Sequence, residues 1–199
     1  MYAIVENNEI TKLITNPKSL VIGDVRYPAK IFSVWSASEL NTIGIYEVVT
    51  DSTNKKDEKW YINTNESYAF ADNQVTRSWG TATPKAHADR NATDENGVEL
   101  NPVVVIEGLK TQLIRTLKQQ VSNELARTDW YITRNTEKET AIPSAISTHR
   151  DAVRTKQAEM ETSITNASNT PALETLYTYT EQDDGSVTRP LGELPTLEI

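Results

Sequence analysis

The stretch that decides the fold runs from Val103 to Ser168, and it predicts two long helices packed on each other. Its first half, residues 103–134, reads VVVIEGLKTQLIRTLKQQVSNELARTDWYITR. Apolar residues recur in it at steps of three or four, namely Ile106, Leu109, Leu113, Leu117, Val121 and Leu125. That period places them on one face of an α-helix. Because such a stripe is unfavourable in water, a second apolar face must cover it.

The second half supplies that face. Residues 141–168 read AIPSAISTHRDAVRTKQAEMETSITNAS. Pro143 stands near the start, where a proline is tolerated because first-turn N–H groups have no helical partner. We predict an αα-hairpin over residues 103–168, with Asp129–Arg134 as the connection. Its interhelical seam consists of Leu113, Leu117, Val121, Ile146, Val153 and Met160, with Ile164 one turn further.

The first 80 residues predict a small β-rich head. Two short apolar runs flank Asn7-Asn8, and Asn tolerates the positive φ of tight hairpin turns. Ser36 and Glu39 have the spacing of a capping box, and Gly44 is placed to end that short helix. The head therefore opens with a hairpin, followed by a short capped helix.

Three strands of a meander are predicted over residues 59–80. A two-residue turn at Asp72-Asn73 would pair Phe70 with Val75, and Tyr68 with Arg77. Residues 81–102 have no periodicity and predict a linker. Residues 169–199 contain three prolines and predict an extended acidic arm. The expected fold class is α+β: a hairpin and meander, a long αα-hairpin, and the extended C-terminal arm.

Composition excludes several partners. The formal net charge of −8 argues against nucleic acid and anionic lipid, because phosphate binding needs clustered Lys and Arg. No run of about 18 apolar residues is present, so we expect no membrane insertion. The first residues lack the basic and apolar regions of a signal peptide, which favours synthesis in a cytoplasm without export. The hydrophobic content of 37% favours small cores completed by partner chains.

Side chains suited to catalysis are sparse. The two histidines, His87 and His149, lie in different segments, without metal-ligand spacing. His87 is expected on the surface and His149 at the helix interface. Asp183-Asp184 precedes Gly185 and is typical of a turn rather than of an acid–base pair. We expect no catalytic residue, no metal and no cofactor, and therefore no enzyme.

Aromatic residues of the meander have two interpretations. Trp60, Tyr68 and Trp79 offer ring faces on which a sugar could stack, so a weak glycan contact is one hypothesis. The alternative is that they fill a small core or a protein interface.

The second half resembles the C-terminal region of bacteriophage tail-fibre assembly and tail-fibre-associated proteins, including those of phages of marine bacteria. The motifs are residues 125–130 (LARTDW), 141–143 (AIP) and 149–154 (HRDAVR). Residues 1–7 (MYAIVEN) and 27–46 are similar to the same group. His149 stands where a Tyr is more usual. The resemblance implies a helix that ends at Asp-Trp, a short loop, and a second helix that opens near Pro.

These features together favour a non-enzymatic bacteriophage tail protein, made in the host bacterial cytoplasm. It would be a virion structural or connector component, associated with tail fibre or baseplate. Its partners would be other tail proteins, in a homo-oligomer or a symmetric assembly. Expected contact residues are Trp130, Arg150, Arg154, Leu176, Tyr177, Tyr179, Leu191 and Leu194.

Some of these residues have a specific expected role. Trp130 would fill an apolar gap at the helix–loop junction. Arg150 and Arg154 would pair with acidic groups of a partner, or else form a solvated helix face. Two other functions remain open, a transient assembly chaperone and a receptor- or glycan-binding module of the tail.

Overall fold

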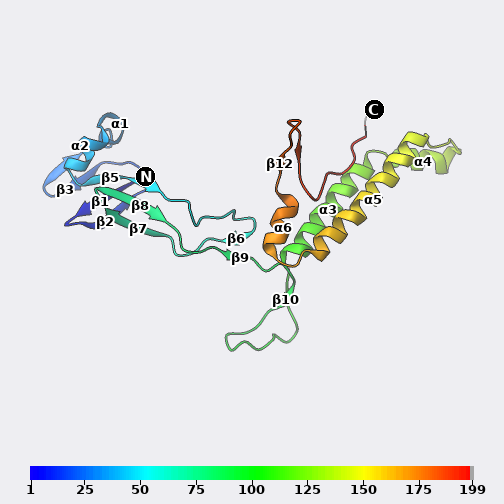
Figure 1. Cartoon of the computed structure of the whole chain (residues 1–199), viewed down its shortest axis with the longest axis horizontal. Helices are drawn as coiled ribbons and strands as arrows, with labels where there is room; N and C mark the ends of the chain where they lie inside the picture. Colours follow the sequence, from blue (N-terminus) through cyan, green and yellow to red (C-terminus); the bar gives the residue numbers. More distant parts are fainter. Residues whose placement is uncertain (198–199) are drawn as a thin grey trace. The chain divides into compact units, whose positions relative to one another are not determined.

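The computed structural model describes residues 1–197, and it contains both sheets and helices (Figure 1). The predicted α+β class is therefore confirmed. The chain divides into two compact units, Met1–Thr83 and Pro84–Ile199. A linker was predicted over residues 81–102, but residues 84–102 belong to the second unit, which contains the long helices. Among the described residues, no helix is both long and apolar enough to span a lipid bilayer.

A five-stranded sheet organises the first unit. Its order is β2 (Glu9–Ile14), β1 (Tyr2–Glu6), β5 (Ile45–Thr50), β8 (Gln74–Ser78) and β7 (Ser67–Ala71). All neighbours are antiparallel except β5 and β8, which are parallel. The two edge strands, β2 and β7, also contact each other, so the sheet curls.

Local signals in the first unit act as predicted. Asn7 and Asn8 have φ values of 52° and 62° and close the β1–β2 hairpin. Ser36 and Glu39 form the capping box of α2 (Ala37–Thr42), which follows α1 (Ile31–Val34). Gly44 ends α2 with φ 79°, and a Cβ there would lie 2.8 Å from the Val5 carbonyl oxygen.

Two small cores lie on opposite faces of the sheet, because neighbouring residues of a strand point to opposite sides. Ile31 of α1 and Leu40 of α2 pack on Ile45. The small hairpin of β3 (Leu20–Ile22) and β4 (Val25–Tyr27) adds to this cluster. On the other face, Val75 packs with Ala3 and Val5.

The predicted meander is right in two strands and wrong in the third. Phe70 pairs with Val75 and Tyr68 with Arg77, as expected. However, β6 (Tyr61–Ile62) pairs with β9 (Thr83–Pro84) in a separate two-stranded sheet. The reason is tertiary: β7, which was to lie between the two outer strands of the meander, has its free edge beside β2.

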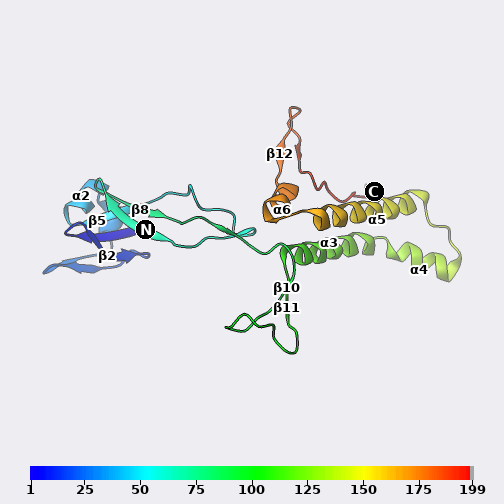
Figure 2. The same cartoon turned by 60° about the horizontal axis from the view of Figure 1, so that its bottom comes forward.

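Two long helices, α3 (Leu109–Ala126) and α5 (Ser144–Asn166), form the predicted hairpin and run side by side (Figure 2). The seam residues are all buried, namely Leu113, Leu117, Val121, Ile146, Val153 and Met160. The stripe predicted from periodicity is therefore confirmed along most of its length.

The first helix begins later than predicted. Helix α3 begins at Leu109 rather than Val103, and Ile106 is 40% exposed in β11 (Val105–Ile106). Gly108 packs so tightly on Ala88 that a Cβ would lie 2.4 Å from its carbonyl carbon. The chain is therefore held in an extended conformation there, and no helix enters from residue 103.

The predicted loop at Asp129–Arg134 is instead a helix, α4 (Asp129–Lys138). Asp129 provides a carboxylate for its first turn and Lys138 a cation for its last, which complements the helix dipole. Glu139 ends it in the left-handed conformation, with φ 52°. The true connection to α5 is the short segment that ends at Pro143, the N-cap residue of that helix.

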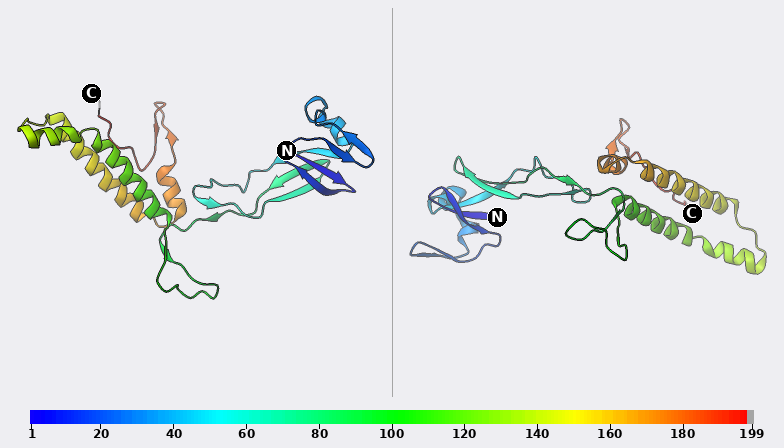
Figure 3. Two further views of the ribbon diagram at one scale, coloured as in Figure 1. Left: turned by 180° about the vertical axis from the view of Figure 1, so that it is seen from behind. Right: turned by 90° about the horizontal axis from the view of Figure 1, so that it is seen from below.

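The C-terminal segment is also less extended than predicted. It begins with α6 (Thr170–Tyr177), which the Asn169 side chain caps by accepting from the Ala172 N–H. Strands β12 (Thr180–Glu181) and β13 (Val187–Thr188) then form a hairpin (Figure 3). Pro171 did not prevent a helix, because it lies in the first turn of α6, where proline is tolerated.

Candidate functional site

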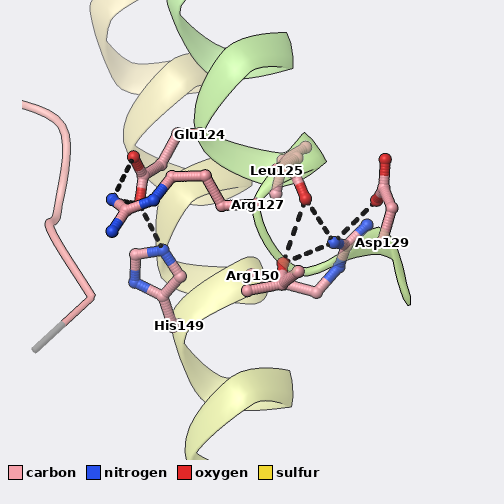
Figure 4. Close-up of polar contacts among 7 residues, drawn as sticks. Glu124, Leu125, Arg127, Asp129, His149 and Arg150 are labelled. Carbon is pink, nitrogen blue, oxygen red and sulfur yellow. Dashed lines mark hydrogen bonds and ion pairs between the residues drawn. The ribbon is translucent and has the colours of Figure 1, made fainter. Parts of the chain in front are cut away.

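Arg150 lies at the centre of a polar cluster at the end of the α3–α5 hairpin (Figure 4). Its Nη1 donates to the Leu125 carbonyl oxygen at 2.8 Å and to Thr128 Oγ1 at 2.6 Å. It also lies 2.9 Å from Asp129 Oδ1. Arg150 is only 8% exposed, so the partner contact predicted for it is wrong. A buried guanidinium needs several acceptors, and these come from its own chain.

His149 occupies the interface position expected for it. Its Nε2 lies 3.1 Å from Glu124 Oε1, and Arg127 Nη1 lies 3.0 Å from the other oxygen of the same carboxylate (Figure 4). Partial burial acts to raise the pKa of Glu124. The hydrogen bonds and charges of Arg127 and His149 outweigh it and lower that pKa overall. The cluster joins α3 to α5 and has the character of a structural contact.

The exposed surface at this end of the hairpin belongs to α4. None of its residues is buried, and Trp130 is 51% exposed, so the prediction that Trp130 fills an apolar gap is wrong. The ring of Trp130 lies 3.7 Å from that of Tyr131, and the Arg134 guanidinium lies 4.8 Å from the Trp130 ring. Ile132 is also exposed. We call Trp130, Tyr131, Ile132 and Arg134 the aromatic tip.

Arg154 is the exposed neighbour of this region on α5. It pairs with Asp151 of its own helix at 3.2 Å, and its side chain is half exposed. Exposed pairs of this kind contribute little to stability. Arg154 was predicted either to pair with a partner protein or to lie on a solvated helix face. In the isolated chain it lies on a solvated face of α5.

The meander aromatics do not present a glycan platform. Trp60 and Trp79 are 3% and 7% exposed, so neither offers an open ring face. The Arg77 guanidinium and the Lys55 ammonium each lie within 5 Å of the Trp79 ring centre. Tyr68 is half-buried and donates to Glu66. The predicted sugar contact through this group is wrong, because these rings pack within the first unit.

The predicted C-terminal anchors divide into inner and outer residues. Leu191 is buried, and its N–H donates to the Leu176 carbonyl oxygen at 3.0 Å. Leu176, Tyr177 and Leu194 are half-buried, whereas Tyr179 is 54% exposed. These anchors therefore pack largely on their own unit.

A second exposed apolar element comprises residues 89–107, which we call the β10–β11 arm. Strand β10 (Arg90–Asn91) pairs with β11 in antiparallel orientation. Periodicity did not reveal the arm, because its aliphatic residues follow one another instead of alternating. The run Val103–Ile106 was itself assigned to the first helix.

One cleft of about 620 Å³ lies in the first unit. It is lined by β2 and the segment after it, with Ile4, Leu13 and Leu20 among apolar residues and Lys12 and Lys18 among charged ones. Within residues 1–197, no group of three or more His, Asp or Glu side chains is placed to hold a metal ion.

No protein-family model, no curated protein and no solved structure matches this chain.

Proposed function

We propose that the chain is a non-enzymatic structural component of a bacteriophage tail, a connector associated with the tail fibre or baseplate. Its partners would be other tail proteins, in a homo-oligomer or a symmetric assembly. The observation that carries the connector role is the aromatic tip. Helix α4 holds no buried side chain and exposes Trp130 and Ile132 to solvent.

Such a helix is incomplete by itself. Isolated helices shorter than about 12–15 residues are marginal in water, and α4 has ten residues. Tryptophan, tyrosine and arginine are also the residues that most often dominate protein–protein binding energy. The tip combines all three, as Trp130, Tyr131 and Arg134. An apolar groove on a neighbouring protein would cover these side chains and stabilise the helix.

The assignment to a phage tail is supported by the sequence resemblance. The Asp129-Trp130 pair belongs to the motif shared with tail-fibre assembly and tail-fibre-associated proteins, as do residues 141–143 and 149–154. In this chain the motif residue Trp130 is also the most exposed large aromatic of the tip. The resemblance and the exposed surface therefore meet at one residue.

The test uses particles purified from cells that produce the phage. We expect the chain in the particles at a constant copy number, measured by quantitative mass spectrometry. Trp130→Ser should retain helical circular dichroism but be lost from particles. The matched control is Thr133→Ser, an exposed change on the same helix.

Two results would contradict the proposal. A chain that is abundant in the lysate and absent from finished particles would favour the transient assembly chaperone. Normal incorporation of Trp130→Ser would show that the connection is made elsewhere on the chain.

A further inference from the structure

The β10–β11 arm is ordered by its backbone but has no core. Every residue from Asp89 to Glu107 is exposed except Ala92, which is half-buried. Its exposed aliphatic residues are Val98, Leu100, Val103, Val104, Val105 and Ile106, each 37–62% exposed. A two-stranded ribbon without packing is marginally stable by itself. Contiguous exposed apolar side chains of this kind mark interaction sites.

The base of the arm is held firmly on the helical unit. Asp89 Oδ1 accepts from the Gly108 N–H at 2.7 Å and from Thr111 Oγ1 at 2.8 Å. The Leu109 N–H donates to the Ala86 carbonyl oxygen at 3.0 Å. These bonds tie the base of the arm to the start of α3, where the arm leaves the helical unit (Figure 3).

The outer edge of β11 has backbone groups available for pairing. The Ala92 N–H donates to the Val104 carbonyl oxygen at 2.7 Å, so the backbone of Val104 faces β10. Because backbone groups alternate along a strand, those of Val103 and Val105 face the opposite side. Among the described residues, no strand pairs with β11 on that side. An added strand would find two donors and two acceptors there.

The charge of the β10–β11 arm decides which kind of strand can pair with β11. The arm carries five carboxylates, at Asp89, Asp94, Glu95, Glu99 and Glu107, against the single cation Arg90. Its net charge of −4 is half of the −8 of the whole chain. A second copy would bring the same charges to the same edge, and like charges disfavour that pairing. A basic strand would instead be attracted.

We propose that the β10–β11 arm is a docking edge for a strand of another protein, one that bears aliphatic side chains flanked by lysine or arginine. Main-chain hydrogen bonds to Val103 and Val105 would give affinity, and the aliphatic and acidic side chains would give specificity. This contact is separate from the aromatic tip, and it holds whether or not the chain is a tail protein.

The test measures binding of labelled nine-residue peptides to the full chain by fluorescence anisotropy. One peptide alternates lysine and valine. Two matched peptides replace its valines with serine, or its lysines with glutamate. We expect the lysine–valine peptide to bind at least about tenfold more tightly than either, since both charge and apolar contact are required. Hydrogen exchange at the Val103 and Val105 amides should slow in its presence.

Variants locate the contact. The double change Val103→Thr and Val105→Thr keeps β propensity and should weaken binding by about tenfold or more. The control double change is Val21→Thr and Val25→Thr, which alters two valines exposed elsewhere. It should leave binding unchanged.

Several outcomes would overturn the proposal. Equal binding of the lysine–serine peptide would show charge attraction alone. Unchanged binding by the Val103 and Val105 double variant, or unchanged exchange at those amides, would place the contact elsewhere. Sedimentation experiments could also show that the chain self-associates and that the double variant does not. That result would identify a second copy of this chain as the occupant.

Discussion

Arg150 Nη1 donates to Thr128 Oγ1 over 2.6 Å, and this bond closes the end of the α3–α5 hairpin. Thr128 is 1% exposed and lies between α3 and α4, so its hydroxyl has little access to water. The same guanidinium nitrogen also donates to the last-turn carbonyl oxygen of Leu125, which accepts from the N–H and the hydroxyl of Thr128 as well. One buried cation from α5 thus orders the chain between the two preceding helices, which places the aromatic tip.

Removing this guanidinium should destabilise the helical unit. Arg150→Ala removes the two hydrogen bonds that the buried guanidinium donates, to Thr128 Oγ1 and to the Leu125 carbonyl oxygen. Hydrogen bonds to charged groups contribute about 1.5–3 kcal/mol each. Chemical denaturation of the full chain measures the loss. Arg154→Ala, an exposed control one turn further along, should stay within about 0.5 kcal/mol of the wild type. Equal effects of the two changes would contradict the structural role of Arg150.

The interhelical seam gives the next prediction. Leu117 is 2% exposed, so Leu117→Asp places an unpaired charge among apolar side chains and should unfold the hairpin. The milder Leu117→Ala should cost about 2–5 kcal/mol. The helical circular dichroism signal reports unfolding by Leu117→Asp, and the same signal followed through a denaturant titration measures the loss caused by Leu117→Ala. Thr116→Asp adds the same charge at an exposed position of the same helix and should retain the helical signal.

Acid should weaken the base of the β10–β11 arm through Asp89. Hydrogen bonds from the Gly108 N–H and the Thr111 hydroxyl hold the pKa of Asp89 below its ordinary value of 3.8. The pKa of Asp89 is lower in the folded protein than in the unfolded chain. The stabilisation by these hydrogen bonds is therefore fully present above the unfolded value of 3.8. It is lost as pH falls through the folded pKa.

Asp89→Asn removes the part of the folding stability that depends on ionisation of this carboxylate. The melting temperature of the wild type should therefore fall more steeply than that of Asp89→Asn as the pH drops from about 5 to about 3. Thr111→Val removes one of the two donors and should show an intermediate slope. Parallel curves for all three proteins would show that Asp89 does not contribute in this way.

The C-terminal segment should be part of the folded unit. Leu173 of α6 is fully buried, and Thr170 Oγ1 donates to the Lys85 carbonyl oxygen at 2.6 Å. Leu173→Ala should therefore destabilise the unit by about 2–5 kcal/mol, measured by denaturant titration. Tyr179→Ala, at an exposed position after α6, should have little effect. A Leu173 variant as stable as the wild type would support the extended arm predicted from the prolines.

The sequence by itself determined the elements whose signal is local or periodic. The seam from Leu113 to Met160 could be predicted because a 3.6-residue period leaves one face of each helix apolar. The Asn7-Asn8 turn and the Ser36–Glu39 cap could be predicted because each depends on residues at most three positions apart. These features need no knowledge of what lies elsewhere in the chain.

Only the tertiary structure decided the partners of residues far apart in sequence. Arg150 is buried because α4 and the end of α3 bring acceptors to it, whereas its position on the helix is equally typical of a solvated face. Trp130 is exposed because α4, which contacts Arg150 of α5 at Asp129, buries none of its side chains. Val105 and Ile106 form a strand instead of a helical turn because Asp89 and Ala88, some twenty residues earlier, fix Gly108. Burial and pairing are set by such distant contacts, and a one-dimensional pattern does not contain them.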